Sequence, residues 1–393
     1  MRIALSVETF LPKIDGIVKI ACLTLDYLRQ YNIEAVIYAP DQGVKNYKDV
    51  PVIGLPCFVD PWYPEGKISI PTPNTYLSLR RFKPDLVHLI DPGFVGLAVG
   101  LSAKVLGVPT VGSYHLSISQ IVKDFGIPLA EKPIRALRVW GFNYVDHALA
   151  PSKVARRRML QHGVHQVGLW RRGVDSQQFH PRFRSQAMRE RLSNGKPDSV
   201  ILLYVGRLSP EKQVHILKKA LEETPNVCLA LLGGGPKEEE LRELFEGLPV
   251  NFVGYLQGQE LAEAYASADI FTFTSRHEAF GLVLGEAIAS GLPVVTTRVG
   301  GAEDVVQHGS SGYIVEVDGV DQMADYIREL AADPDRRALM GQRARETAET
   351  LQWDDMMREL IYFYEDVVRT STGRDPRLSP QGRPKSPMFL PKT

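Results

Sequence analysis

The chain has 393 residues, of which 44% are hydrophobic and 23% are charged, and its formal net charge is zero. This length is typical of two globular domains, each large enough to bury its own core. The best apolar segment, residues 93–103, is shorter than the roughly 18 residues that cross a bilayer, so any membrane contact is expected to be peripheral.

Charge is unevenly distributed along the chain. Residues 1–170 contain 19 Lys and Arg against 13 Asp and Glu, a net charge of +6, so the remainder carries −6. Between residues 131 and 158 two acids, Glu131 and Asp146, accompany seven bases: Lys132, Arg135, Arg138, Lys153, Arg156, Arg157 and Arg158. A solvated basic face explains most such clusters, and the alternative is a surface that binds anionic lipid.

The cysteines and the first residues bear on the cellular compartment. Cys22, Cys57 and Cys228 lie far apart without metal-ligand spacing, which indicates buried thiols in a reducing compartment. The chain starts directly with an apolar strand instead of a basic-then-apolar leader. We therefore expect a cytoplasmic protein that associates with membranes peripherally.

The first elements form a strand-helix-strand unit. Residues 2–6 predict a strand, residues 17–28 a helix with apolar side chains at helical spacing, and residues 34–40 a second strand. Gly16 precedes the helix and would let the backbone approach a phosphate, although a plain turn glycine explains it equally well.

The rest of the first half continues this alternation. Residues 41–73 are irregular and contain Phe58, Trp62 and Tyr63, either as packed loop aromatics or as part of a loop that binds an acceptor or a membrane. Further strands are predicted at residues 85–90, 109–115 and 147–152, with helices at 94–106 and 133–142; the second helix is basic and amphipathic, with Trp140 and Phe142.

His115 is a candidate site residue. It lies just past the apolar part of its strand, at the carboxyl edge of the sheet, where doubly wound domains bind ligands. A lone histidine is also commonly a structural residue, so its position alone leaves both interpretations open.

The strand-helix alternation restarts in the second half. Residues 169–184 lack a clear period and contain Pro181, which predicts a hinge. Strands are then predicted within residues 200–212, 227–236, 250–256, 269–275, 293–297 and 312–317, and three amphipathic helices follow through Tyr364. Two successive series of alternating strands and helices predict an α/β protein with two Rossmann-like, doubly wound parallel-sheet domains facing a cleft.

The most informative stretch runs from His277 to Val295. Eight residues of helix turn by about 800°, so Glu278 and Glu286 are expected to border the same cleft. We interpret Glu278 as accepting hydrogen bonds from a sugar and Glu286 from a ribose; an ordinary helix with an acidic first turn is the alternative. A helix start attracts a diphosphate, and its first N–H groups are predicted near Phe280, Gly281, Leu282 and Val283.

A second candidate element is the loop that follows the strand beginning at Val200. Arg207 and Lys212 flank this loop, and two fixed cations there would clamp a diphosphate and stabilise it as it leaves; a surface pair is the alternative. Three glycines at 233–235 would let a flat base approach the backbone. The sequence contains no Ser-His-Asp pattern, no metal-ligand cluster and no P-loop, so we expect no metal and no cofactor.

The set of Gly16, His115, Arg207, Lys212 and the Glu278–Glu286 spacing resembles the retaining family-4 glycosyltransferases of the GT-B fold, over residues 1–368. Residues 8–18, 169–195 and 254–269 are most similar to sulfoquinovosyltransferases, which transfer sulfoquinovose from UDP-sulfoquinovose to diacylglycerol. The resemblance implies a hexosyltransferase with an acceptor and membrane-side domain (1–180) and a nucleotide-sugar-binding domain (181–370). Residues 371–393 contain five bases against one acid with repeated prolines and no periodicity, so we expect this basic tail to be disordered.

The same resemblance implies roles for the site residues. Arg207 and Lys212 would bind the diphosphate, assisted by Gly16. Glu278 and the amides after it would hold donor hydroxyls and phosphate, Glu286 the ribose and His115 the transferred sugar. The acceptor hydroxyl would attack on the face that the diphosphate leaves, with retention and without a metal, and the departing phosphate would take its proton. The implied partners are a nucleotide sugar, a lipid acceptor and an anionic membrane surface, with no nucleic acid.

Two positions depart from the sulfolipid enzymes. Leu116 and Ser117 follow His115 where those enzymes tend to have Thr and a second His, and Arg276 with His277 replaces an acidic, serine-rich turn. Arg276 would suit a sulfonate, but an exposed arginine fits equally well. The donor sugar therefore stays open, with UDP-glucose, UDP-galactose or GDP-mannose and another lipid or a soluble acceptor as the alternative. A non-catalytic sugar-nucleotide or membrane-binding protein is disfavoured, because both cations and both acids are present.

Overall fold

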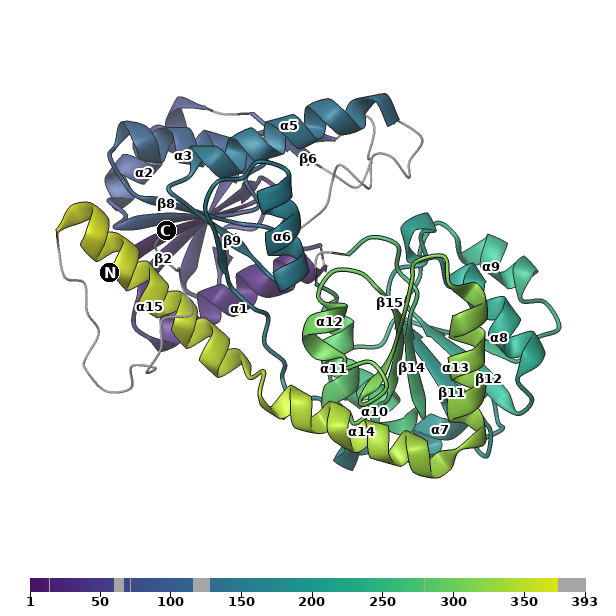
Figure 1. The fold of residues 1–393 in the computed structure, drawn as a ribbon. Coiled ribbons are helices and arrows are strands. Elements are labelled where there is room, and N and C mark those ends of the chain that lie inside the picture. Colours follow the sequence, from purple (N-terminus) through teal and green to yellow (C-terminus); the bar gives the residue numbers. More distant parts are fainter. Residues whose placement is uncertain (14, 60–66, 71, 116–127, 279, 374–393) are drawn as a thin grey trace. The chain divides into compact units, whose positions relative to one another are not determined.

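The fold is described from a computed structural model, which covers residues 1–13, 15–59, 67–70, 72–115, 128–278 and 280–373 (Figure 1). Contacts divide the chain into two compact units. Among the described residues, unit 1 contains those up to 115, residues 129–171 and residues 354–373, and unit 2 contains residues 172–353 together with Pro128. Some residues discussed from the sequence lie outside the described residues: Trp62, Tyr63, Leu116, Ser117 and residues 374–393.

The division differs from the expected boundaries of 1–180 and 181–370. The chain passes into unit 2 at Arg172, and all but the first residue of the final helix, α15 (Trp353–Thr372), belongs to unit 1. Long-range packing explains this return, because Phe363 of α15 contacts the ring of His147 edge to face in unit 1.

Unit 1 is built on an eight-stranded sheet with the order β10-β9-β8-β7-β1-β2-β4-β3. Its strands are β1 (Arg2–Val7), β2 (Glu34–Pro40), β3 (Asn46–Tyr47), β4 (Val50–Leu55), β7 (Leu86–Ile90), β8 (Thr110–Ser113), β9 (His147–Ala150) and β10 (Val167–Leu169), and β5 (Cys57–Val59) pairs separately with β6 (Lys67–Ser69). All neighbours in the large sheet are parallel except β3 and β4. The prediction of an irregular segment at 41–73 was therefore wrong where β4 extends the sheet beside β2.

Helices cover both faces of the unit 1 sheet: α1 (Gly16–Gln30), α2 (Pro73–Phe82), α3 (Phe94–Val105), α5 (Pro128–Tyr144), α6 (Lys153–Gln161) and α15. Side chains of a strand alternate between faces, so Val87 and Leu89 of β7 join the core under α3, while His88 points to the opposite face and meets α15. Figure 1 shows α2, α3 and α5 along one face of this sheet and α1 with α15 along the other. The two covered faces explain why these strands read as continuous apolar runs.

Unit 2 contains a six-stranded, fully parallel sheet with the order β13-β12-β11-β14-β15-β16. Its strands are β11 (Val200–Val205), β12 (Val227–Leu232), β13 (Val250–Gly254), β14 (Ile270–Phe273), β15 (Val294–Thr297) and β16 (Gly312–Val315). Its α-helices are α7 (Gln186–Leu192), α8 (Leu217–Glu223), α9 (Glu238–Leu244), α10 (Gly258–Ser267), α11 (Leu282–Ala289), α12 (Ala302–Val305), α13 (Val320–Ala332) and α14 (Pro334–Glu349), with 3-10 turns at Pro181–Phe183, Pro210–Lys212 and Val214–Ile216. Two cores, one on each face of the sheet, confirm the doubly wound prediction.

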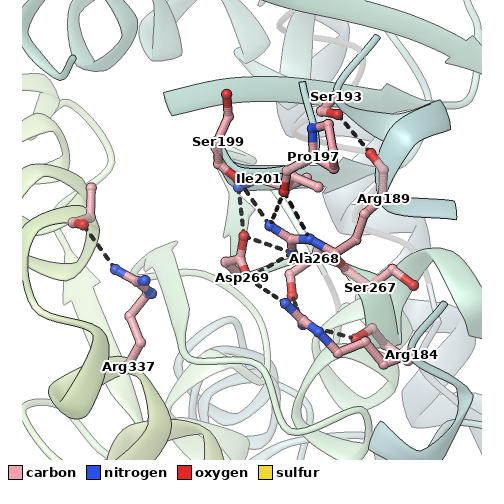
Figure 2. Close-up of polar contacts among 12 residues, drawn as sticks. Arg184, Arg189, Ser193, Pro197, Ser199, Ile201, Ser267, Ala268, Asp269 and Arg337 are labelled. Atoms are coloured by element: carbon pink, nitrogen blue, oxygen red, sulfur yellow. Dashed lines mark hydrogen bonds and ion pairs between the residues drawn. The ribbon is translucent and has the colours of Figure 1, made fainter. Parts of the chain in front are cut away.

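The amino ends of β11 and β14 are fixed by a polar network (Figure 2). Arg189 of α7 donates to both carboxylate oxygens of Asp269 and to the backbone carbonyls of Pro197, Ser199 and Ser267. Asp269 also accepts from the N–H of Ile201, at the start of β11. The two strands are thereby held in register at the edge opposite their carboxyl ends.

The basic cluster between residues 131 and 158 is not a single surface. Arg138 lies largely buried and forms an ion pair of 2.5 Å with Asp91, and the guanidinium of Arg156 donates to the carbonyl of Val167. Trp140 is 49% exposed, whereas Phe142 is 3% exposed and packs in the core with Ala148 and Met159, so of these two aromatics of the helix only Trp140 is at the surface. Within the described residues, no helix has the length and apolarity to cross a bilayer.

Candidate functional site

The candidate site in unit 2 is formed by loops at the carboxyl ends of β11 and β14, which are neighbours in the parallel sheet. The two loops are bonded to each other. Thr274 Oγ1 donates to the carbonyl of Lys212 at 2.5 Å, and the N–H of Arg276 donates to the carbonyl of Glu211 at 2.7 Å. Two hydrogen bonds thus join the loop that carries the cations to the loop that carries Glu278, at the carboxyl edge of the sheet.

Lys212 and Glu278 meet directly at this edge. Lys212 Nζ lies 2.6 Å from Glu278 Oε2, with the side chains 17% and 23% exposed, and Nζ also lies 5.4 Å from the ring centre of Phe273. A pair that is largely shielded from water but still reachable is preorganised to meet a charged ligand, because its electrostatic interactions are less screened than those of surface pairs. The structure therefore brings together two of the residues that the sequence singled out.

Arg207 lies in the same loop, just after β11, and is partly buried. Tyr204 Oη donates to the carbonyl of Arg207 at 2.9 Å, and the N–H of Leu208 donates to the carbonyl of Gly234. Burial raises the pKa of Tyr204 well above its ordinary value, so its hydroxyl stays a neutral donor. These bonds hold the backbone that carries the predicted phosphate-binding cation.

Of the three glycines at 233–235, Gly233 and Gly235 pack closely against the backbone of the Arg207 loop. A Cβ at Gly233 would lie 2.0 Å from the carbonyl oxygen of Gly206, and one at Gly235 would lie 2.4 Å from that of Leu208. Gly233 also has a φ of +124°, which an L side chain rarely adopts. The contact that requires these glycines is with the Arg207 loop; the predicted approach of a base remains a prediction.

Helix α11 begins at Leu282, within the range predicted for its first N–H groups. Gly281 is the residue before the helix, with a φ of +85°, and Leu282 and Val283 form its first turn, where backbone N–H groups have no acceptor within the helix. Phe280 is 6% exposed, and its ring fills the space beside Gly301, so its side chain is a packing group. Glu278 lies outside the helix, so the two acids are not related by about 800° of helical turn, and that prediction was wrong.

Glu286 is held in a different way. It lies on α11 with 8% of its surface exposed, and Tyr265 Oη of α10 donates to its Oε2 at 2.9 Å. Tyr265 was not identified from the sequence, where it appears only as one apolar position of an amphipathic helix. The hydroxyl orients the carboxylate and offsets part of the cost of burying it.

Gly16 and His115 belong to unit 1. Gly16 is exposed and is the first residue of α1; Asp15 Oδ1 accepts from the N–H groups of Ile17 and Val18, both at 2.9 Å, so a side chain caps this helix start. His115 follows β8, with its Nε2 2.7 Å from Ser113 Oγ and its ring edge to face with Trp170.

Unit 1 also contains polar residues that the sequence did not single out. Glu8, just after β1, accepts from the N–H groups of Val95 and Gly96 at the start of α3, and desolvation by burial raises its pKa to about 7. The buried His88 within β7 is a signal that could have been used, because a polar residue in an apolar strand needs partners. Among the described residues, no group of three or more His, Cys, Asp or Glu is arranged to hold a metal ion.

Comparisons with known proteins bear on the whole chain. Residues 14–178 match Glycosyltransferase Family 4, and residues 187–347 match Glycosyl transferases group 1. The chain is 36% identical over 335 residues to sulfoquinovosyl transferase SQD2 of Arabidopsis thaliana, covering 83% of this chain and 66% of that protein. It is 33% identical over 376 residues to a GDP-mannose-dependent alpha-mannosyltransferase of Mycobacterium tuberculosis, covering 93% of this chain and 97% of that protein.

Solved structures agree on the architecture. HepE of Anabaena in complex with UDP and glucose aligns with a TM-score of 0.75 at 19% identity, over 93% of this chain and 100% of that one. Sucrose-phosphate synthase of Thermosynechococcus elongatus aligns with a TM-score of 0.75 at 20% identity, over 94% and 99% of the two chains. The protein thus belongs to the group 1 and family 4 glycosyltransferases: it has the GT-B fold and is a hexosyltransferase that uses a nucleotide-sugar donor.

Proposed function

We propose that the protein transfers sulfoquinovose from UDP-sulfoquinovose to a lipid acceptor such as diacylglycerol, with retention of anomeric configuration. The observation that carries the choice of donor is the likeness to sulfoquinovosyl transferase SQD2. The alternative, a GDP-mannose-dependent transferase, is favoured by the mannosyltransferases that align along nearly their whole length. UDP-glucose and UDP-galactose remain further donors for the same site.

The unit 2 edge supports the proposed handling of the donor. Lys212, with Arg207 in the same loop, would neutralise the diphosphate, and the first turn of α11 would add backbone N–H groups. Glu278, now paired with Lys212, would accept hydrogen bonds from sugar hydroxyls once the cation engages phosphate. Glu286 would hold the ribose in the orientation set by Tyr265.

The proposed acid-base step needs no metal or other cofactor. The acceptor hydroxyl would attack the anomeric carbon on the face that the diphosphate leaves, and a departing phosphate oxygen would take its proton. His115 would line the reaction centre against the transferred sugar, and Gly16 would assist at the diphosphate. These roles are those that the family resemblance implies for residues present at the matching positions.

Arg276 is the candidate residue for recognising the sulfonate. Its guanidinium lies 2.8 Å from Asp318 Oδ1 with both side chains exposed, so little desolvation opposes an exchange of this partner for a ligand. Arg276 lies two residues before Glu278, and its backbone N–H is fixed by a hydrogen bond to the carbonyl of Glu211. Arg276→Met should therefore reduce the preference for UDP-sulfoquinovose over UDP-glucose.

The decisive experiment supplies purified protein with UDP-sulfoquinovose, UDP-glucose, UDP-galactose or GDP-mannose, each with diacylglycerol vesicles and with a lipid extract. We expect labelled sulfoquinovosyl diacylglycerol, with an α-linkage by NMR. A product formed only from GDP-mannose would replace the proposed donor by the alternative.

The exposed Trp140 and the basic residues of unit 1 predict that the protein sediments with anionic vesicles at low salt. Absence of sedimentation at every salt concentration would count against a membrane-bound acceptor.

A further inference from the structure

A line of hydrogen bonds connects the carboxyl-terminal helix α15 to His115 within unit 1. Tyr364 Oη is hydrogen-bonded to His88 Nδ1. His88 Nε2 lies 2.7 Å from Ser113 Oγ, and Ser113 Oγ lies 2.7 Å from His115 Nε2. Residues more than 240 positions apart in the chain are thus joined through three contacts across the first sheet.

The inner members of this line are sealed from water. Tyr364, His88 and Ser113 are each 0% exposed, and the ring of Trp170, 1% exposed, lies edge to face with both His88 and His115. Within such an environment a buried polar group must keep its partner, because an unmet hydrogen bond costs about 1–3 kcal/mol. The geometry of the line is therefore strongly constrained.

The direction of the hydrogen bonds follows from Tyr364. Among the described residues, its hydroxyl has a single hydrogen-bond partner, His88 Nδ1. Burial raises the pKa of Tyr364 well above its ordinary value, so the phenol stays protonated and donates a hydrogen bond to His88 Nδ1. A neutral His88 then carries its proton on Nε2 and donates to Ser113 Oγ, which leaves the Ser113 hydroxyl to donate to His115 Nε2.

We propose that Tyr364, His88 and Ser113 form a relay that fixes the ring orientation and the tautomer of His115. Nε2 of His115 is an acceptor in this arrangement, and its neutral form carries the proton on Nδ1. Tyr364, His88 and Ser113 are positioning residues, because they act on the substrate only through His115. The consequence for transfer rests on the proposed role of His115 at the reaction centre.

The relay gives α15 a function beyond packing. The helix belongs to unit 1 although it follows all of unit 2 in sequence, and its Tyr364 reaches the face of β7 opposite to α3. A defined tautomer matters because a histidine that meets a sugar hydroxyl offers either a donor or an acceptor, but not both, at a given ring nitrogen. The partner on the other ring nitrogen sets which is offered.

The test compares Tyr364→Phe and Ser113→Ala with a matched control, Tyr38→Phe. Tyr38 is also 0% exposed in unit 1, and its hydroxyl is hydrogen-bonded to a serine, Ser78, at 3.0 Å; within the part of the chain that the structure describes, it makes no hydrogen bond to the relay. Nitrogen NMR of protein labelled at histidine reports the tautomer directly, with His115 assigned from the signals missing in His115→Ala. Steady-state kinetics and urea unfolding are measured on the same samples.

We expect wild type and Tyr38→Phe to show His115 protonated at Nδ1, and Tyr364→Phe and Ser113→Ala to show mixed tautomers. The two relay variants should lose about 10- to 100-fold in kcat, with a smaller change in the KM for the donor. This is the loss typical of removing a residue that orients a functional histidine, as known for histidines that bind metals. Ser113→Thr keeps the hydroxyl and should retain much of the activity that Ser113→Ala loses. An unchanged His115 tautomer in both relay variants would overturn the proposal. Full transfer by His115→Ala would instead refute the proposed role of His115, while the NMR result would still decide the relay.

Discussion

Two tyrosines of unit 2 donate hydrogen bonds to glutamates and provide a matched pair of residues. Tyr265 donates to Glu286 at 2.9 Å, and Tyr313 donates to Glu329 at 2.6 Å. Only the first glutamate is a candidate ligand for the ribose. Tyr265→Phe should weaken binding of the nucleotide about 10-fold, the equivalent of one hydrogen bond to a charged group, whereas Tyr313→Phe should cost stability alone. Calorimetric titration with UDP distinguishes them, and equal affinities in both variants would remove Glu286 from the nucleotide site.

Glu8 gives a prediction about pH. Desolvation raises its pKa from an ordinary value of 4.5 to about 7, although the N–H groups of Val95 and Gly96 act to lower it. The folded state therefore binds the proton more tightly than the unfolded chain, so this residue's contribution to stability is complete below pH 4.5 and is lost as pH rises towards 7. Glu8→Gln should remove that decline. Urea unfolding at about pH 5 and about pH 8 measures it, and the same pH dependence in both proteins would contradict the assignment.

At the scale of elements, unit 2 depends on the contact of α7 with the amino ends of β11 and β14 (Figure 2). Arg189 and Asp269 are 11% and 13% exposed. Removing Arg189 would leave Asp269 paired with the half-exposed Arg184 and would also take the donor from the buried backbone carbonyls that Arg189 binds. Arg189→Met should therefore destabilise unit 2 by about 3 kcal/mol or more.

A control comes from the same helix. Arg191 pairs with Glu260 at 2.8 Å in the solvent, with side chains 46% and 60% exposed, so Arg191→Met should cost less than about 1 kcal/mol. Hydrogen exchange of the β11 and β14 amides gives both values. If Arg191→Met lowers protection as much as Arg189→Met does, the network in Figure 2 has no special part in holding these strands.

Local patterns predicted most elements because their causes are local. The apolar run of β14 and the polar turn after it both appear in the sequence, and the structure has the strand at Ile270–Phe273. The start of α11 at Leu282 falls within the predicted range, but Glu278 was wrongly counted as helical, because Gly281 with its positive φ precedes the first turn and periodicity does not report that angle. β4 was missed for another reason: it is a strand through its pairing with β2, which is a long-range contact.

The candidate site could be predicted in part for the same reasons. Lys212 and Glu278 each follow a strand, and neighbouring parallel strands end at one edge, so their contact at 2.6 Å is a consequence of sheet order. The pairing of Tyr265 with Glu286 and of His88 with Tyr364 could not be predicted, because hydrogen bonds between distant elements depend on packing that residue types alone do not specify.

On the scale of the whole molecule, the chain order does not follow the units. The sequence runs through unit 1, then unit 2, and returns to unit 1 in α15, where Tyr364 and Phe363 make their contacts. The hinge predicted at residues 169–184 includes the point where the chain passes from unit 1 to unit 2. The return of α15 to unit 1 was not predicted, because nothing local in an amphipathic helix specifies the sheet that it covers. Truncation before α15 would therefore remove part of unit 1.

The proposed transfer depends on Arg207 and Lys212, which would stabilise the diphosphate as it leaves the sugar. The most direct measurement is kcat/KM for the donor in Arg207→Ala and Lys212→Ala, beside Lys219→Ala, a lysine of the same unit that pairs with acids in the solvent. We predict a loss of about 100-fold or more in each of the first two variants, about 3 kcal/mol of transition-state stabilisation, and wild-type turnover in the third. Near-normal turnover in both Arg207→Ala and Lys212→Ala would contradict the claim.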